Sequence, residues 1–487
     1  MTTETVGTAG GAALEADAYV SIRLRSDAAL HETPGTVGGL QLSSAHGTTM
    51  LPPMPPGMRE ALRVLARSET TEAELAALVT QLDGERGLLR LHMTMLQFDR
   101  AGLLEHAVCE RGGTPARLRP VGRGPAVVTR PAPGTVAKLS RFAVLRAADG
   151  VLVAQQPRSH LALDLSGSGV AAAGLLADWT KLDSFAVPGV SPRSVNELIA
   201  LMYTAGLLVT GGPGDDPEIQ DPARAMWTPE DLWLHARARG TRLSSGYGGT
   251  YRFKGRFAPL PALPEERGGT RIVLPRPDLE AIEANDPPFT RVLEARRSVR
   301  EHDDASPITA AQLGELLFRA LRHRRPPQTG ADGQQFCDRP YPSGGAAGEL
   351  EVYPMVTRCE GIAAGLWHYE SDRHALRMIA EPGPGTAALT GAARSAGLMT
   401  GDPQVVLIVA ARFGRIAWKY DSMAYSLILK HVGVLYQTVY LVATAMGLAV
   451  CGLGGGDASD FAAASGLDYF REGSVGEILL GSARAGR

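Results

Sequence analysis

Three separated segments in the C-terminal half carry side chains that could do chemistry, and the first is rich in guanidinium groups. Arg296, Arg297, Ser298 and Arg300 lie within one short segment. Arginine makes forked, charge-assisted hydrogen bonds to phosphate oxygens, and a serine hydroxyl adds a neutral donor. The segment could therefore hold a monophosphate group, although short arginine clusters also occur as solvated surface patches.

The second segment is a turn of small residues, Pro342, Ser343, Gly344 and Gly345, which leads into an alternating strand from Leu350. Residues without bulk let the backbone come close to a flat ring, where amides and a hydroxyl can meet its polar edge. A Ser-Gly-Gly sequence often does no more than reverse the chain, so the turn is a weak signal when taken alone.

The third segment is the pair Lys419-Tyr420, which precedes a long apolar helix expected to begin near Ser422. An ammonium group close to a phenol favours the phenolate, and a phenolate is a usable base near neutral pH. The alternative is a pair that only anchors the start of the helix, and the residue types alone favour that alternative.

Several elements that would position these segments can be predicted from periodicity. Thr309 and Gln312 form a capping box ahead of an amphipathic helix. Apolar patterns also predict a hairpin followed by two further strands, at residues 365–369, 375–379, 405–411 and 477–481. His368 and His374 lie across the hairpin with no third ligand nearby. We interpret them as surface imidazoles and predict no metal site.

The apolar stretch from Val432 to Gly456 contains no charged side chain and is long enough to cross a bilayer. Its polar interruptions and glycine-rich end favour a fully buried helix followed by a glycine loop, so we predict no membrane association. Gly454 and Gly455 lie in this loop. Because a dinucleotide-binding loop follows a strand rather than a helix, we reject a dinucleotide site here.

The N-terminal part contains a degenerate repeat whose copies both end in Ala-Gly-Leu-Leu, at residues 101–104 and 205–208. A strand-like segment and short helices precede each motif, and Thr71 and Glu74 form a capping box in the first copy. This layout resembles a winged helix. Residues 51–110 carry six Arg and no Lys against nine acidic residues, a net charge of −3, which argues against a DNA-binding face. Winged-helix units in peptide-modifying enzymes often bind the leader of a precursor peptide, so the resemblance implies either that role or a purely structural one.

Taken in order, the three C-terminal motifs resemble the SagB-type azoline dehydrogenases of the nitroreductase superfamily. In that family R-R-S-x-R and P-S-x-G-A segments contact FMN, and a Lys-Tyr pair is essential. The lead-in around Thr228, an expected helix N-cap, fits the same resemblance. A basic residue near the end of such domains, here Arg484 or Arg487, can add a phosphate contact. The resemblance makes Lys419 and Tyr420 catalytic and implies FMN held by Arg296, Arg297, Ser298, Arg300, Pro342, Ser343, Gly344, Gly345, Gly454, Gly455 and Arg484.

The resemblance also implies a reaction, the oxidation of thiazoline or oxazoline rings to thiazoles or oxazoles in a ribosomally made peptide, as in thiopeptide biosynthesis. The expected partners are the azoline-containing precursor peptide, cyclodehydratase proteins and a second copy of this chain, because nitroreductase folds usually form homodimers with the flavin between subunits. Two alternatives stay open. One is an NAD(P)H-dependent nitroreductase acting on small molecules, and the other is an inactive homologue that only binds precursor peptide.

The length and composition of the chain limit the number of domains, the partners and the location that we expect. A chain of 487 residues is too long for one ordinary core. We expect a tail at 1–18, winged-helix-like units at 19–118 and 135–212, a lead-in at 213–290 and the dehydrogenase domain at 291–487. The fold class is α+β, with a nitroreductase-like mixed sheet wrapped by helices in the last domain. A formal charge of −2 gives no general attraction to nucleic acid. Four scattered cysteines and the lack of a basic N-terminal segment favour the cytoplasm.

Overall fold

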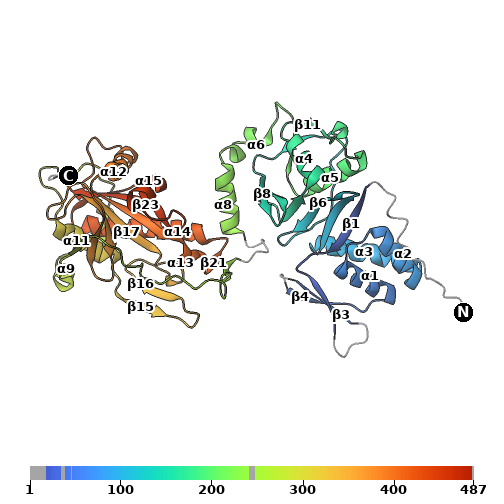
Figure 1. Cartoon of the computed structure of the whole chain (residues 1–487), viewed down its shortest axis with the longest axis horizontal. Helices are drawn as coiled ribbons and strands as arrows, with labels where there is room; N and C mark the ends of the chain where they lie inside the picture. Colours follow the sequence, from blue (N-terminus) through green and yellow to red (C-terminus); the bar gives the residue numbers. More distant parts are fainter. Residues whose placement is uncertain (1–17, 34–38, 45–46, 241–246, 485–487) are drawn as a thin grey trace. The chain divides into compact units, whose positions relative to one another are not determined.

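The computed structural model describes residues 18–33, 39–44, 47–240 and 247–484, and the chain divides into two compact units, Met1–Gly246 and Tyr247–Arg487 (Figure 1). The tail expected at residues 1–18 lies outside the described residues apart from Ala18. The first unit holds both copies of the N-terminal repeat, and the second holds all three C-terminal motifs.

A six-stranded antiparallel sheet joins the two repeat copies within the first unit. Its strand order is β1 (Ala18–Leu24), β5 (Leu104–Glu110), β6 (Gly113–Pro120), β10 (Leu161–Leu165), β9 (Val151–Gln155) and β8 (Val144–Ala148). β6 of the first copy pairs with β10 of the second, and Leu118 lies opposite Leu163. The two copies therefore share one sheet inside a single compact unit.

Helices follow the strands in each copy. The first copy has α1 (Pro56–Arg67), α2 (Glu72–Asp83) and α3 (Arg86–Arg100), and the second has α4 (Gly167–Leu175) and α5 (Pro192–Thr204). The predicted capping box of Thr71 and Glu74 is confirmed at the start of α2. Two small sheets complete the strands, β2 (Ala29–Glu32), β3 (Leu40–Ser44) and β4 (Gly47–Leu51), and β11 (Thr180–Lys181), β7 (Val136–Leu139) and β12 (Leu208–Thr210). The unit ends in α6 (Pro217–Gln220), α7 (Pro222–Ala225) and α8 (Pro229–Arg239), and Thr228 caps α8 as predicted.

A seven-stranded sheet forms the centre of the second unit. Its order is β14 (Arg271–Val273), β19 (Ala375–Ala380), β18 (Gly365–Glu370), β17 (Leu350–Val356), β20 (Val405–Arg412), β23 (Glu472–Ser482) and β22 (Leu448–Gly452). The predicted strands and the hairpin are confirmed, and so is the α+β class. Every neighbouring pair is antiparallel, where a mixed sheet was expected, because hairpins and antiparallel returns connect these strands instead of parallel crossovers.

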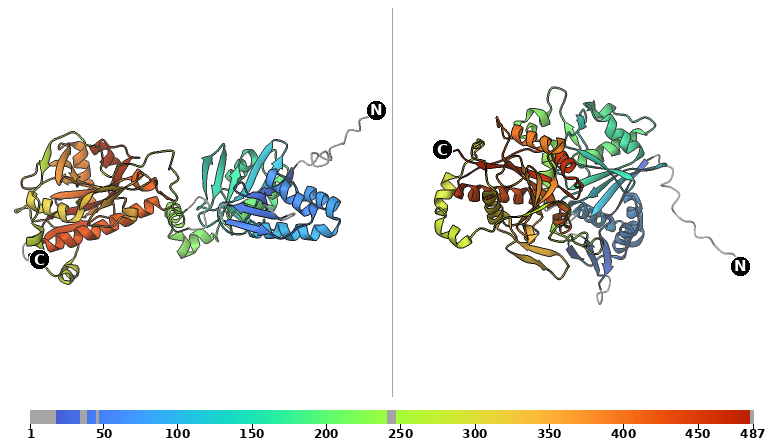
Figure 2. Two further views of the ribbon diagram at one scale, coloured as in Figure 1. Left: turned by 90° about the horizontal axis from the view of Figure 1, so that it is seen from below. Right: turned by 60° about the vertical axis from the view of Figure 1, so that its left-hand side comes forward.

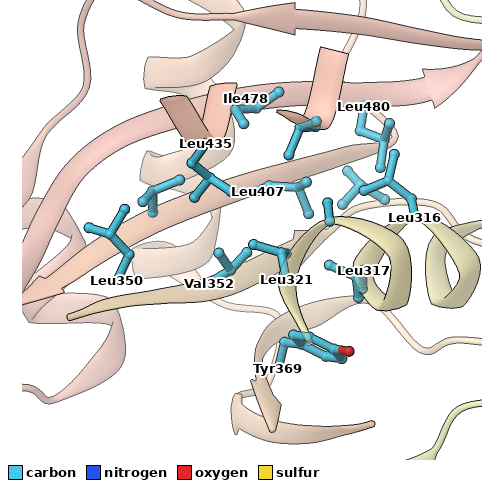
Figure 3. Close-up of a cluster of buried hydrophobic side chains, with 14 of the residues drawn as sticks. Leu316, Leu317, Leu321, Leu350, Val352, Tyr369, Leu407, Leu435, Ile478 and Leu480 are labelled. Atoms are coloured by element: carbon cyan, nitrogen blue, oxygen red, sulfur yellow. The ribbon is translucent and has the colours of Figure 1, made fainter. Parts of the chain in front are cut away.

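Helices cover both faces of this sheet, α11 (Ala310–Leu321) and α14 (Ala424–Ala445) on one face and α12 (Pro384–Ala396) and α15 (Ala458–Ser465) on the other. Leu316 of α11 and Leu435 of α14 join Val352 and Leu407 of the sheet in one buried cluster (Figure 3). Because helices cover both faces, β17 is buried along its whole length, and the alternation expected for this strand is absent. The predicted capping box of Thr309 and Gln312 is confirmed at the start of α11.

The long apolar stretch forms two elements where one helix was expected. α14 ends at Ala445, the chain turns at Gly447 with a φ of 69°, and β22 carries the rest of the stretch into the sheet. A glycine tolerates this left-handed conformation and lets the helix end there. The glycine loop thus follows a strand and precedes α15, so the expectation that it follows a helix is wrong. The order of elements therefore no longer argues against a dinucleotide site.

α14 is also not fully buried. Its apolar residues Tyr425, Leu429 and Val434 expose 47%, 40% and 38% of their surface. Among the described residues, one helix, α14, is long enough and apolar enough to cross a membrane, judged by length and composition alone. Its opposite face packs on the sheet, and Figure 2 shows it as the long orange helix along one side of its unit. The exposed face is therefore available for contact with another molecule.

His368 and His374 are buried in the hairpin of β18 and β19, so their interpretation as surface imidazoles is wrong. Nε2 of His368 lies 3.1 Å from Oε2 of Glu351, and Nδ1 of His374 lies 2.9 Å from the hydroxyl of Tyr369. Other segments cover both faces of the hairpin, and buried polar groups need internal partners. Among the described residues, no group of three or more His, Cys, Asp or Glu is arranged to hold a metal ion.

The remaining elements of the second unit lie around these layers. They are β13 (Gly248–Gly249), α9 (Leu279–Asn285), α10 (Phe289–Ala295), β15 (Arg325–Thr329), β16 (Gln335–Asp338), α13 (Phe413–Ala417) and β21 (Tyr420–Asp421). β13 pairs with β21, and β15 pairs with β16 in a separate hairpin.

Candidate functional site

The arginine-rich segment is tied to α14 and β22 through Tyr440. The hydroxyls of Ser298 and Tyr440 lie 2.8 Å apart, and the guanidinium of Arg296 lies 5.3 Å from the centre of the Tyr440 ring. The backbone N–H of Gly452 donates to the Tyr440 hydroxyl at 2.8 Å, and the N–H of Val299 donates to the carbonyl of Val450. The segment after α10 is thus fixed against the end of β22, with its charged side chains toward solvent.

A pocket of about 430 Å³ adjoins this segment, and Arg297, Ser298, Arg300 and Arg484 line it together with the loop at residues 398–402. Of the three acids in its wall, Glu301, Asp304 and Asp402, the last two are engaged by arginines outside the pocket. Asp304 pairs with Arg358 at 2.9 Å, and Asp402 pairs with Arg394 at 2.8 Å.

Arg297 and Arg300 are exposed, and neither has an ion-pair partner in the part of the chain that the structure describes. The pocket therefore offers uncompensated positive charge beside a serine hydroxyl, the combination that a phosphate group requires. Arg484 donates to the carbonyl of His302 at 3.2 Å and lies 3.9 Å from Glu301. The second C-terminal candidate, Arg487, lies outside the described residues.

The glycine loop lines a different pocket, of about 490 Å³, between the exposed side of α14 and β23. Gly454 and Gly455 form part of its wall, and a Cβ atom at either position would meet nothing within 4 Å. Tyr436 of α14 fixes the base of the loop, because its hydroxyl donates to the carbonyl of Leu453 and accepts from the N–H of Glu477 at 2.7 Å. Burial raises the pKa of the Glu477 carboxyl above its usual range.

The small-residue turn lies beside the Lys-Tyr pair. Gly345 has a φ of 60°, and a Cβ atom at this position would lie 2.7 Å from both Nζ of Lys419 and the hydroxyl of Tyr420. The turn is closed by Ser343, whose hydroxyl accepts from the N–H of Gly348 at 3.0 Å. Pro342 precedes it and is exposed. The structure thus brings the second and third motifs together across more than seventy residues of sequence.

Aromatic rings surround the ammonium group of Lys419. Its Nζ lies 5.6 Å from the ring centre of Tyr251, 5.8 Å from that of Phe336 and 5.4 Å from that of Tyr420. The backbone is held as well, because the N–H of Tyr251 donates to the carbonyl of Lys419 at 3.1 Å and β13 pairs with β21. Ring faces stabilise a cation without neutralising it. The ammonium charge therefore remains available to a neighbouring phenol or substrate.

The sequence interpretation did not identify Tyr251, Phe336, His431, Tyr436 and Tyr440 as part of the site. Tyr436 and Tyr440 are four residues apart on α14, a spacing that places them on one side of a helix and could have marked a polar edge. Nothing in the sequence linked Tyr251 or Phe336 to Lys419, since both lie in loops or short strands far from it.

The candidate residues occupy two sides of α14, which we call the Tyr440 flank and the His431 flank. The Tyr440 flank carries the arginine-rich segment and the glycine loop, and the His431 flank carries the small-residue turn, whose Gly344 N–H donates to Nε2 of His431 at 2.7 Å. His431 and Tyr440 are nine residues apart. At 3.6 residues per turn this makes about two and a half turns, so they project from opposite sides of the helix. Within one chain, the two sets of candidate residues are therefore separated by α14.

Comparisons with known proteins give a consistent picture for the second unit. A model described as the nitroreductase family matches residues 293–482. A protein of Methanocaldococcus jannaschii named as a nitroreductase is 31% identical over 186 residues, which are 38% of this chain and 85% of that protein. Among solved structures, a nitroreductase of Ralstonia eutropha JMP134 is 23% identical, with a TM-score of 0.33, and the match covers 46% of this chain and 95% of that one. A chain of the E. coli microcin synthetase McbBCD complex with truncated pro-MccB17 bound is 22% identical, with a TM-score of 0.34, covering 55% of this chain and 94% of that one.

Proposed function

The chain belongs to the nitroreductase family, and we propose that within it the protein is an FMN-dependent dehydrogenase of azoline rings in a ribosomally made peptide. The observation that carries this proposal is the contact of Lys419 and Tyr420 with the turn at Gly345. A phenol and an ammonium beside a bulk-free stretch of backbone provide a base next to a place where flat rings can lie.

FMN, the cofactor that the family generally uses, fits the residues on the Tyr440 flank. Arg297, Ser298, Arg300 and Arg484 would hold the phosphate, because they share one pocket and two of the guanidiniums lack an acidic partner in the described part of the chain. Arg296 would contribute charge from its place over the Tyr440 ring. Gly454 and Gly455 would let the backbone lie close to the cofactor, since they present no side chain to it.

The pair on the His431 flank would handle the proton. Oxidation of an azoline to an azole removes a hydride and a proton from adjacent ring atoms, and FMN, when bound, supplies the acceptor for the hydride. Tyr420 would take the proton as its phenolate and become a neutral phenol, and the ammonium of Lys419 would stabilise the negative charge of the phenolate before that transfer. The rings of Tyr251 and Phe336 would keep the ammonium oriented toward Tyr420.

We propose that each active site combines residues of two chains. The two flanks lie on opposite sides of α14, so the helix separates the two sets of residues within one chain. Pairing through the exposed apolar face of α14, with Phe289 and Leu293 of α10 also exposed at 67% and 43%, would bury this surface. It would also bring the Tyr440 flank of one chain to the His431 flank of the other.

For the first unit we propose binding of the precursor-peptide leader, in line with its expected winged-helix character. The helix α3 exposes Leu89 and Met93 at 71% and 46%, and β4 pairs only with β3 among the described strands. A free strand edge can accept a peptide as an added strand, and exposed apolar side chains can receive its anchors. Leu89→Glu is expected to raise KM at least tenfold for a substrate with its leader and to leave KM unchanged for the core peptide alone. Equal effects on both substrates would contradict leader binding.

Two other functions can be distinguished from the proposed oxidation of azoline rings. A small-molecule nitroreductase would use NAD(P)H and would have no need of a phenol and ammonium pair beside the turn. An inactive peptide-binding scaffold would bind no flavin, although the unpaired Arg297 and Arg300 favour a phosphate ligand. The cytoplasm as location and cyclodehydratase proteins as partners belong to the same proposal, because the azoline substrate must be made before it is oxidised.

A turnover assay with an azoline-bearing peptide tests the proposal. Tyr420→Phe and Lys419→Ala are each expected to lower kcat by about a hundredfold or more, the usual contribution of a general base. Tyr469→Phe is the matched control, because Tyr469 is half exposed on a loop of the same unit and should tolerate the change with full activity. If both site variants turned over at the wild-type rate with flavin bound, the assignment would be wrong.

A further inference from the structure

A buried acid lies behind the small-residue turn, connected to it through one imidazole. Glu349 is fully buried, with an exposed fraction of 0%, and Oε1 of its carboxylate contacts Nδ1 of His431. His431 is itself 6% exposed, and its Nε2 accepts the N–H of Gly344 at 2.7 Å. The residues form a chain of hydrogen bonds from the interior of the second unit to the turn.

The N–H of Gly344 determines which ring nitrogen of His431 carries the proton in this series of hydrogen bonds. An amide N–H can only donate, so Nε2 of His431 must be the unprotonated nitrogen, and the proton of a neutral ring must be on Nδ1, where it points at Glu349. Within the described residues, Oε2 of Glu349 makes no hydrogen bond, so His431 provides the hydrogen bond that offsets burial of this acid. The pair is therefore locked in one tautomer and one orientation.

The residue after the anchored amide is the one that touches the Lys-Tyr pair. Gly345 follows Gly344 directly. A Cβ atom added to Gly345 would lie 2.7 Å from Nζ of Lys419 and 2.7 Å from the hydroxyl of Tyr420. The turn contains two successive left-handed residues, Gly345 at φ 60° and Ala346 at φ 53°. Such a conformation persists only where surrounding contacts hold it. The hydrogen bond from Gly344 to His431 is one such contact.

We propose that His431, oriented by Glu349, is a positioning residue that holds the Gly344-Gly345 turn in place and so sets where Lys419 and Tyr420 stand. This inference rests on the proposed function for its effect on catalysis, but its structural content does not need a substrate. Within the described residues, the hydrogen bonds of the His431 ring go to Glu349 and to the Gly344 amide, so His431 acts on Lys419 and Tyr420 through the turn.

The chain offers a matched control for this proposal. His368 on β18 and Glu351 on β17 form a second buried imidazole and carboxylate pair in the same unit, with 3.1 Å between Nε2 and Oε2. No hydrogen bond of His368 in the described structure leads to the small-residue turn. Replacing His368 therefore removes a comparable buried pair without releasing Gly344.

The test compares His431→Leu, His431→Gln and His368→Leu in the full-length protein by hydrogen exchange and by turnover. Wild-type protein labelled with ¹⁵N-histidine should show His431 as the neutral Nδ1–H tautomer. His431→Leu should speed amide exchange of residues 343–348 and lower kcat about tenfold with flavin content unchanged, because a displacement on the order of 1 Å at the reacting groups can cost up to about a hundredfold in rate. His431→Gln, whose amide oxygen can still accept, should recover most of both losses, and His368→Leu should leave exchange of the turn unchanged.

The outcomes separate this inference from the proposed function. If His431 proved to be the Nε2–H tautomer, or if exchange of the turn were unaffected in His431→Leu, the positioning role would be overturned whatever the substrate. Faster exchange with no change in turnover would also overturn it, since the turn would then not govern the Lys-Tyr pair. If the wild-type protein failed to oxidise azoline peptides, the proposed function would fall, while the tautomer and exchange results would still decide the structural link.

Discussion

Replacing Gly345 by alanine should separate a geometric requirement of the site from simple backbone strain. The added Cβ would lie 2.7 Å from Nζ of Lys419 and from the hydroxyl of Tyr420, whereas ordinary van der Waals contact begins at 3.4 Å. Both groups, or the turn itself, must therefore move by about 0.7 Å, and displacement on the order of 1 Å in an active site can cost about a hundredfold in rate. We expect kcat to fall between about tenfold and a hundredfold.

Gly466 provides the matched control for this substitution. It caps α15 with φ 68° and ψ 14°, close to the φ 60° and ψ 27° of Gly345, and a Cβ there would meet nothing within 4 Å. Each alanine should lower the free energy of unfolding by about 1 to 2 kcal/mol, the cost of a left-handed non-glycine residue. Tm should accordingly fall by a few degrees in both variants.

The assay is turnover of an azoline peptide by each variant, normalised to bound flavin, together with thermal unfolding. We expect Gly345→Ala and Gly466→Ala to lose similar stability and only Gly345→Ala to lose rate. If Gly345→Ala kept the wild-type rate, or if both variants slowed equally, close approach of the turn to the Lys-Tyr pair would not be what the chemistry depends on.

Three further predictions address the cofactor, the assembly and acid stability. Arg300→Gln should weaken FMN binding by about tenfold to a hundredfold, the value of one charge-assisted hydrogen bond, as measured by fluorescence titration of the flavin; unchanged affinity would exclude a phosphate contact. At an FMN concentration too low to load Arg300→Gln protein, mixing it with Tyr420→Phe protein should restore about a quarter of wild-type activity, because half of the dimers are mixed and each mixed dimer has one intact site. No recovery would show that a site lies within one chain. Burial lowers the pKa of His302 and of His323 to about 4, from an ordinary value of 6.5. Between these two pH values the unfolded chain binds protons that the folded chain does not bind. The free energy of unfolding should therefore decrease as pH falls from 6.5 to about 4, by up to about 1.4 kcal/mol per pH unit for each histidine. His302→Gln should make this decrease with pH smaller, as measured by urea unfolding at several pH values.

Much of the second unit could be predicted because its elements carry local signals. The capping box of Thr309 and Gln312 defines the start of α11, and the hairpin of β18 and β19 follows from two apolar stretches separated by polar turn residues. The end of α14 could not be predicted, since a strand buried on both faces is as uniformly apolar as a buried helix. Gly447 marks the point where the helix ends, but a single glycine in a sequence does not distinguish a kinked helix from the end of a helix.

The site was predictable only in part. The three motifs were found as separate segments, but the contact between Gly345 and the Lys-Tyr pair depends on how β21 lies against the turn, which no local pattern encodes. His431 was not identified as a site residue, because its partners, Glu349 and Gly344, are distant in the sequence. The shared sheet of the first unit was missed for the same reason, since pairing of β6 with β10 joins two copies that each have their own strand and helix signals.

The division of candidate residues between two flanks of α14 is the feature that most changes the interpretation of the site. From the sequence, the arginine-rich segment, the turn and the glycine loop were expected to surround one cofactor within one chain or between two. The helix places Ser298 beside Tyr440 and Gly344 beside His431, half a turn out of phase. This separation supports the proposal that a complete site needs a second copy, which would bind at the exposed face of α14.

Anaerobic mixing of the flavin-loaded protein with an azoline-bearing peptide tests the central claim most directly. The account predicts that the peptide alone bleaches the visible absorbance of the oxidised flavin and that the product peptide is lighter by two hydrogen atoms for each ring oxidised. Tyr420→Phe protein, loaded to the same extent, should bleach about a hundredfold more slowly. Rapid bleaching by NADPH alone, with no reaction of the peptide, would contradict the account and identify a small-molecule reductase instead.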